Sequence, residues 1–243
     1  MKSQQSALRI ILSLTLLFIL LLSLTSCKTS PTATGNQTSG ATTVDTVSAA
    51  TASRYRVGEI REFQGKLLSP AVGPRDNSIS GVQKVDIAKY SLQIDGLVDQ
   101  PVQMTYDEVK TLTAYERLIT LHCVEGWDAT MLWKGVRIED LLNKAGVKPD
   151  AVTVIFHAVD GYITSMPLAT VRERQMILAY MANGIPLPPE MGYPFIVVAE
   201  DKLGYKWARW VTKIELSNDP NYKGYWESGG YSNTADVPDS RKP

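Results

Sequence analysis

The hydrophobic and polar positions of the central part of the chain predict a series of short strands with few helices among them. Tyr90, Leu92 and Ile94 alternate with polar residues and stop at Asp95-Gly96, which is the pattern of a strand that ends in a turn. Similar patterns predict strands over residues 115–122, 152–158, 163–166, 177–181, 195–199 and 207–216. Because the helices are few and short, we expect an α+β fold that is weighted to β.

Two short helices interrupt the predicted strands. Thr105 and Glu108 have the spacing of a capping box, which predicts a helix to about Leu112. A second helix is expected over residues 138–145, because Gly146 follows in the usual stop position.

Turn residues indicate how some of the strands pair. Asp160-Gly161 predicts that strand 152–158 pairs back with 163–166, and Asn183-Gly184 is a strong hairpin signal. Residues 221–243 are rich in Tyr, Gly, Ser and Asp, and we expect an irregular segment packed by its aromatic side chains.

The first residues have the pattern of a bacterial lipoprotein signal peptide. Lys2 and Arg9 supply a positive start, an uncharged apolar run of 13 residues follows over 10–22, and Leu24-Thr25-Ser26-Cys27 resembles a lipobox. A membrane-spanning helix needs about 20 residues, so an uncleaved signal anchor is the weaker alternative. We expect residues 1–26 to be removed and lipidated Cys27 to anchor the protein to a membrane outside the cytoplasm.

The mature chain is predicted to have two parts. Residues 27–53 are almost entirely Thr, Ser, Ala, Gly and Pro, which predicts a flexible tether that holds the domain roughly 28 Å from its lipid. Residues 54–243 are enough for one domain with a hydrophobic core that needs no disulfides. Loss of the signal peptide leaves 23 basic against 25 acidic residues, which disfavours nucleic acid as a partner.

Cys123 is the one thiol that remains once Cys27 is lipidated. It follows predicted strand 115–122 and precedes Glu-Gly-Trp, where a loop is more typical than a core position. A lone thiol in an oxidising compartment is open to oxidation, and coordination to a soft metal would protect it. Cys123 is therefore a candidate metal ligand, and a small buried hydrophobe is the alternative.

Other chemistries for Cys123 have less support in the sequence. A structural zinc site takes four Cys or His ligands, whereas the domain offers Cys123, His122 and His157. His122 and Cys123 are neighbours on a strand, so their side chains should point to opposite faces. A metal here would bring most of its ligands within a cofactor. A nucleophilic cysteine with His157 as base, or a sensor thiol, lacks a local signature or a resolving cysteine.

Four segments of the sequence resemble the sulfite-oxidase-like molybdopterin-dependent oxidoreductases. They are residues 122–127 (HCVEGW), 161–168 (GYITSMPL), 183–188 (NGIPLP) and 204–211 (GYKWARWV), and their order and spacing agree as well. The resemblance covers about residues 90–216. It implies the sulfite-oxidase-like molybdopterin-binding fold of mixed sheets and short helices, with molybdenum-molybdopterin as the cofactor.

The resemblance also implies roles for particular residues. Cys123 would be the protein thiolate on molybdenum, and Glu125 and Trp127 would shape the approach to the metal; a solvated turn charge and a core aromatic are their plain alternatives. The turn that ends at Arg209 would cradle the phosphate end of the pterin. The expected cofactor contacts are His122, Cys123, Thr164, Gly204, Tyr205, Lys206, Trp207 and Arg209.

The sequence departs from the family pattern in three places. Members often carry a polar residue before the glycine of a Gly-x-Pro segment and an arginine just after the proline, but residues 191–196 read MGYPFI. The Cys-Ala-Gly-Asn turn of sulfite oxidases is absent at residues 123–127, so sulfite is a poor substrate candidate. Residues 1–9 contain no arginine pair for twin-arginine export.

Two functions are therefore compared. The first is a membrane-tethered, extracytoplasmic molybdopterin oxidoreductase that moves an oxygen atom to or from a small molecule and exchanges electrons with a haem protein or a quinone-linked membrane protein. The second is a non-catalytic lipoprotein binding module that keeps the fold without the cofactor.

Overall fold

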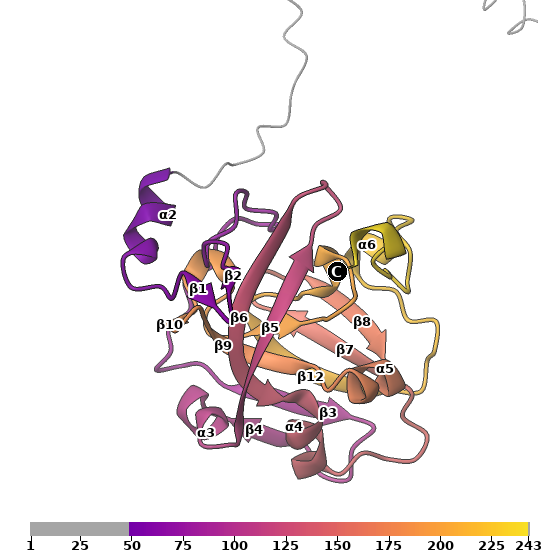
Figure 1. The fold of residues 1–243 in the computed structure, drawn as a ribbon. Helices are drawn as coiled ribbons and strands as arrows, with labels where there is room; N and C mark the ends of the chain where they lie inside the picture. The colour runs from indigo at the N-terminus through magenta and orange to yellow at the C-terminus, as the bar shows by residue number, and fades with distance from the viewer. Residues whose placement is uncertain (1–48, 243) are drawn as a thin grey trace, which may run out of the picture. The chain divides into compact units, whose positions relative to one another are not determined.

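The computed structural model describes residues 49–242 (Figure 1). The predicted signal peptide, Cys27 and most of the predicted tether lie outside these residues, although the helix α2 (Ala49–Arg56) covers the last residues assigned to the tether. No helix of residues 49–242 is long and apolar enough to cross a membrane.

Two five-stranded sheets make up most of the domain. The first has the order β10-β9-β6-β5, with β11 also paired to β9, and the second has the order β4-β3-β12-β7-β8. The first sheet comprises β5 (Ala114–His122), β6 (Asp128–Arg137), β9 (Ile177–Ala182), β10 (Ile185–Pro186) and β11 (Ile196–Val198). The second comprises β3 (Leu92–Gly96), β4 (Val102–Met104), β7 (Thr153–Ala158), β8 (Ile163–Pro167) and β12 (Val211–Ser217). Every strand pair is antiparallel except β3 with β12.

Short helices and turns join these strands. They are α3 (Tyr106–Lys110), α4 (Ile138–Ala145), α5 (Leu168–Glu173), α6 (Tyr225–Ser228) and the 3-10 turns η1 (Pro189–Met191), η2 (Gly204–Lys206) and η3 (Asp239–Arg241). A separate two-stranded hairpin, β1 (Glu62–Phe63) with β2 (Lys66–Leu67), lies near α2. The β-weighted α+β class predicted from the sequence is confirmed.

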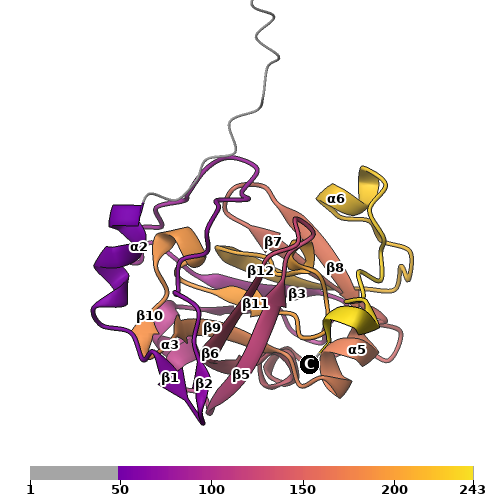
Figure 2. The same cartoon turned by 45° about the horizontal axis from the view of Figure 1, so that its top comes forward.

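One hydrophobic core lies between the sheets. Trp133 on β6 is fully buried, and its ring centroid is 5.6 Å from that of Trp207. From the second sheet Leu92, Phe156 and Ile214 are also fully buried. Figures 1 and 2 show the long β5–β6 hairpin lying across the second sheet, which places its tip, the turn after Cys123, at one end of the domain.

Most of the predicted elements are present. The capping box of Thr105 and Glu108 forms at α3, and α4 begins and ends at the predicted residues with Gly146 as its C-cap. The hairpins β7–β8 and β9–β10 are confirmed. The C-terminal segment is packed by aromatic rings, with Trp226 and Tyr231 centroids 5.2 Å apart.

The elements β4, α5 and α6 were not predicted from the sequence, and three further features differ from the prediction. The strand β6 was not expected, because Lys134 and Gly135 interrupt its hydrophobic pattern at a bulge against β9. A Cβ at Gly135 would lie 2.2 Å from the Leu178 carbonyl oxygen, so the close approach of β9 requires glycine there. The strand expected over 207–216 begins only at Val211, because Gly204–Lys206 forms a 3-10 turn.

The third difference concerns β7. Alternation predicted one buried face, but Thr153, Val154, Ile155 and Phe156 are all buried. The Thr153 hydroxyl donates to the Asp219 carbonyl at 2.7 Å, and α5 packs against the strand.

Candidate functional site

Cys123 begins a tight turn between β5 and β6. Its backbone N–H donates to the Trp127 carbonyl at 2.9 Å, and its carbonyl accepts from the Gly126 N–H at 3.1 Å. The thiol lies at the strand end, as predicted, but it is buried rather than exposed on a loop. Gly204 closes against it, because a Cβ at Gly204 would lie 3.6 Å from the Cys123 Cα.

A loop that precedes β3, residues 71–80, covers this turn. The Asn77 amide donates to the Cys123 Sγ at 3.4 Å and to the Glu125 carboxylate at 3.3 Å. The ring of Trp127 packs against Gly73 and its Nε1 donates to Glu125 at 3.0 Å. The thiol, the carboxylate and the indole predicted to act together therefore share one small network.

The same loop reaches Arg209. The Arg209 guanidinium is 3.1 Å from the Asp76 carboxylate, donates to the Glu190 carbonyl at 2.8 Å and lies over the Trp210 ring. Burial lowers the pKa of Arg209, and the charge of Asp76 opposes that shift. Asp76 and Asn77 are adjacent in the chain, so Arg209 and Cys123 face the same short stretch of the loop.

Burial also sets the state of the thiol. It raises the pKa of Cys123, and the Glu125 carboxylate adds to this. Hydrogen bonds from the Glu125 backbone N–H and from Asn77, together with the charge of Arg241, lower the pKa, but burial is the larger cause. In the protein alone, the thiol therefore favours its protonated form.

Lys206 and Thr164 meet away from this network, at a fully buried carboxylate. The Lys206 ammonium forms an ion pair with Glu227 and donates to the Ser165 carbonyl at 2.8 Å, while the Thr164 hydroxyl donates to Glu227 at 2.7 Å. Asn233 accepts a third, longer contact from Lys206 at 3.4 Å. Burial lowers the pKa of Lys206.

The remaining predicted cofactor contacts line the same end of the domain. The His122 Nδ1 is 2.8 Å from the Asp128 carboxylate, and His122 pairs with Leu203 in an isolated bridge. The Trp207 Nε1 donates to the Lys202 carbonyl. The Tyr205 hydroxyl donates to the Ser232 carbonyl, and the Tyr205 carbonyl accepts from Tyr162.

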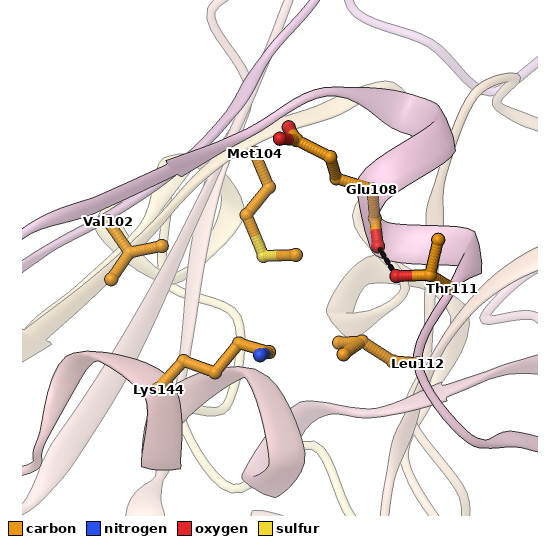
Figure 3. Close-up of a pocket in the computed structure, with 6 residues that line it drawn as sticks. All are labelled: Val102, Met104, Glu108, Thr111, Leu112 and Lys144. Atoms are coloured by element: carbon orange, nitrogen blue, oxygen red, sulfur yellow. Dashed lines mark hydrogen bonds between the residues drawn. The ribbon is translucent and has the colours of Figure 1, made fainter.

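Other groups stand apart from this end. The His157 Nε2 is 2.8 Å from the Glu215 carboxylate on β12, so the imidazole pairs with this carboxylate and not with Cys123. Among residues 49–242 no cluster of three His, Cys, Asp or Glu side chains could hold a metal ion. A shallow pocket between β4, α3 and α4 is lined by Val102, Met104, Glu108, Thr111, Leu112 and Lys144 (Figure 3). It lies beside the start of β5, and Cys123 follows the other end of that strand.

Three residues of the site were not predicted from the sequence. They are Asp76 and Asn77, in the loop before the first predicted strand, and Arg241, which donates to the Cys123 carbonyl at 2.9 Å. The polar run of residues 75–78 was the only local signal.

The structure also shows the departure from the family pattern at residues 191–196. Met191 and Phe195 are both buried in the core, so two positions that are often polar in the family are apolar here.

Comparisons with known proteins identify the family of the chain. The family model of the oxidoreductase molybdopterin binding domain matches residues 79–226. An uncharacterised oxidoreductase, YuiH, of Bacillus subtilis is 40% identical over 147 residues, which are 60% of this chain and 74% of that protein. A putative protein-methionine-sulfoxide reductase subunit, YedZ1, of Azospira oryzae is 35% identical over 62% of this chain and 57% of its own length.

More distant relatives match smaller shares of their own length. The mitochondrial sulfite oxidase of Macaca fascicularis is 27% identical over 62% of this chain but only 33% of that protein. The sulfane dehydrogenase SoxCD of Paracoccus pantotrophus has the same fold, with a TM-score of 0.60 and 24% identity over 66% of this chain and 46% of that one. The protein thus belongs to the oxidoreductase molybdopterin-binding domain family, and it is an oxidoreductase whose cofactor is molybdenum-molybdopterin.

Proposed function

We propose that this protein is a membrane-tethered, extracytoplasmic oxidoreductase that moves an oxygen atom to or from a small molecule, with Cys123 as its molybdenum ligand. One observation carries the proposal: a soft thiol and a buried cation contact adjacent residues of the same loop. Cys123 contacts Asn77, and Arg209 contacts Asp76. A cofactor that has a metal at one end and an anion at the other needs a thiolate for the metal and a cation for the anion, no farther apart than the cofactor is long.

The residues of the site fit such a cofactor. The Asp76 carboxylate stands in for an anion, because it sits 3.1 Å from the Arg209 guanidinium where a phosphate oxygen would bind. Gly204, where an added Cβ would lie 3.6 Å from the Cys123 Cα, begins the turn that would approach the cofactor with its backbone. One protein thiolate suffices where the other soft ligands belong to the pterin.

Each part of the site would then have a separate task. The bound cofactor supplies the metal that is oxidised and reduced by two electrons as oxygen is transferred. Cys123 fixes the position of that metal, and Arg209 holds the anionic end. Asn77 and Trp127 orient the Glu125 carboxylate, which is two residues from the thiol and available to hold a proton near the substrate.

The substrate class follows from the relatives and from the sequence of the turn. The Azospira relative is named as a subunit of a putative protein-methionine-sulfoxide reductase, which makes an S-oxide the first acceptor to test. Residues 123–127 lack the sulfite-oxidase turn, which disfavours sulfite. Electrons would come from a haem protein or a quinone-linked membrane protein, because the sequence has no haem-attachment motif of its own.

The direct test is the metal and pterin content of protein purified from its own host, together with reduction of S-oxides by a reduced dye. Stoichiometric molybdenum and pterin with dye-dependent turnover would support the proposal. Protein that carries no molybdenum and no pterin would reject it in favour of the non-catalytic binding module.

Arg209→Ala is expected to lose pterin while the domain stays folded. A charge-assisted contact contributes about 1.5 to 3 kcal/mol, so retention should fall by at least tenfold. The variant also leaves Asp76 without its cation, so Asp76→Asn in the same background should restore melting temperature but not pterin. Asp76→Asn alone should keep the pterin. Wild-type pterin content in Arg209→Ala would remove Arg209 from the site.

Cys27→Ala is expected to leave full-length or soluble protein in place of a membrane-bound form that labels with fatty acid. Two acyl chains are enough for stable anchoring of the processed chain. Fatty-acid labelling and membrane fractionation of wild type and variant provide the measurement. The lipoprotein proposal fails if the wild type does not label and both proteins partition alike.

A further inference from the structure

The C-terminal tail reaches the turn that carries Cys123 through one side chain, Arg241. Its Nη1 donates to the Cys123 carbonyl at 2.9 Å, and its Nη2 is 3.3 Å from the Trp127 carbonyl. These two carbonyls are the ones that close the turn, since each also accepts a backbone N–H from within it. Arg241 further forms an ion pair with Asp128, the first residue of β6.

Asp128 connects this contact to the other side of the thiol. Its carboxylate is also 2.8 Å from the Nδ1 of His122, the residue immediately before Cys123. One guanidinium therefore joins the residue at the start of the turn, the residue at its end and, through Asp128, the last residue of β5.

The tail is itself held in place beside the site. The Leu203 N–H donates to the Ala235 carbonyl at 2.8 Å, and the Val237 N–H donates to the Asp201 carbonyl at 2.9 Å. Ala235 and Val237 are buried. Because Leu203 also pairs with His122, the end of β5, residues 201–203 and residues 235–237 lie side by side.

We propose that Arg241 is a positioning residue that fixes the Cys123 turn, and with it the sulfur, from the C-terminal tail. The planar guanidinium has five donors in a fixed fork, which suits two carbonyls and a carboxylate at once. A lysine would offer a compact ammonium without this fixed fork of donors. The effect on turnover rests on the proposed function, whereas the effect on the turn does not.

Arg241→Gln, Arg241→Lys and Lys242→Gln make a matched set. Lys242 is the neighbouring cation, and it pairs with Asp239 and not with the Cys123 turn. The measurement is hydrogen exchange by mass spectrometry on protein prepared without cofactor, which follows the Cys123 and Gly126 amides independently of molybdenum. Melting temperature and exchange in β7 and β12 report on the rest of the domain.

We expect Arg241→Gln to speed exchange in the peptide that contains residues 123–127 by at least tenfold, because a charged donor to both carbonyls is lost. Arg241→Lys should recover only part of this, and Lys242→Gln should match the wild type. Unchanged exchange at the turn in both Arg241 variants, or an equal rise throughout the domain, would overturn the proposal.

A second readout uses cofactor-loaded protein. If the sulfur is displaced at the metal, Arg241→Gln should lower kcat more than KM and alter the molybdenum(V) electron paramagnetic resonance spectrum at unchanged molybdenum content. An unaltered spectrum with a loosened turn would overturn the link to the sulfur. Absence of molybdenum from the wild type would instead reject the proposed function and leave the exchange result standing.

Discussion

Cys123→Ser should abolish molybdenum-dependent turnover, with a loss of at least about a hundredfold, because removal of even an outer partner of a metal ligand commonly costs 10- to 100-fold. A hydroxyl is harder and far less acidic than a thiol, so it is a poor replacement on a soft metal. Activity with a reduced dye and an S-oxide, molybdenum content and pterin content are measured on the same preparations. Pterin should fall less than activity, since Arg209 still holds the anionic end.

A structural role for the thiol predicts a different outcome. Cys123 is buried, so a serine also costs stability by placing a hydroxyl there. Val124→Ser is the matched control, because it puts the same hydroxyl on an exposed neighbour in the turn. If Cys123→Ser lowers only the melting temperature and leaves turnover per molybdenum intact, the sulfur is not a ligand.

The elements that were predicted correctly are those that local sequence specifies. The capping box at Thr105 and Glu108 and the stop at Gly146 place α3 and α4 through contacts within a few residues. β6 could not be identified in this way, because its bulge at Lys134 exists only where β9 packs against it. Burial of Thr153 on β7 likewise depends on a distant residue, because its hydroxyl donates to the Asp219 carbonyl.

The residues of the site also fall into those that local sequence locates and those that only tertiary contacts bring in. Cys123 and its turn could be located from the sequence because a strand and a following Glu-Gly-Trp are local features. Asn77, in contrast, is 46 residues from Cys123 in the chain, and Arg241 is 118 residues away. Asp76, Asn77 and Arg241 also lie outside residues 79–226, where the family model matches, so only the tertiary structure reveals them.

The structure changes the interpretation of Lys206, which was expected to contact the cofactor. Its ammonium is fully buried and directs its donors to Ser165, Glu227 and Asn233, which leaves none for a phosphate. Glu227 is buried to the same extent and keeps one carboxylate oxygen without a hydrogen-bond partner. The pair therefore supports the packing of α6 against β8 and η2.

Lys206→Met should accordingly destabilise the domain by about 3 to 5 kcal/mol, because it leaves a buried carboxylate without its cation. In a domain of this size that corresponds to a fall in melting temperature of roughly 6 to 20 °C. Lys202→Met is the matched control: its partner Asp236 is 63% exposed, so the loss should stay below about 1 kcal/mol.

The double variant Lys206→Met with Glu227→Leu separates stability from cofactor binding. Replacing a buried pair by apolar residues of similar volume is often close to neutral, so the double variant should recover most of the lost stability. If Lys206 acts through packing alone, the recovered protein should also carry pterin at the wild-type level. A stable double variant that has lost its pterin would instead show that the ammonium contacts the cofactor, and that its contacts to Ser165 and Glu227 rearrange when the cofactor binds.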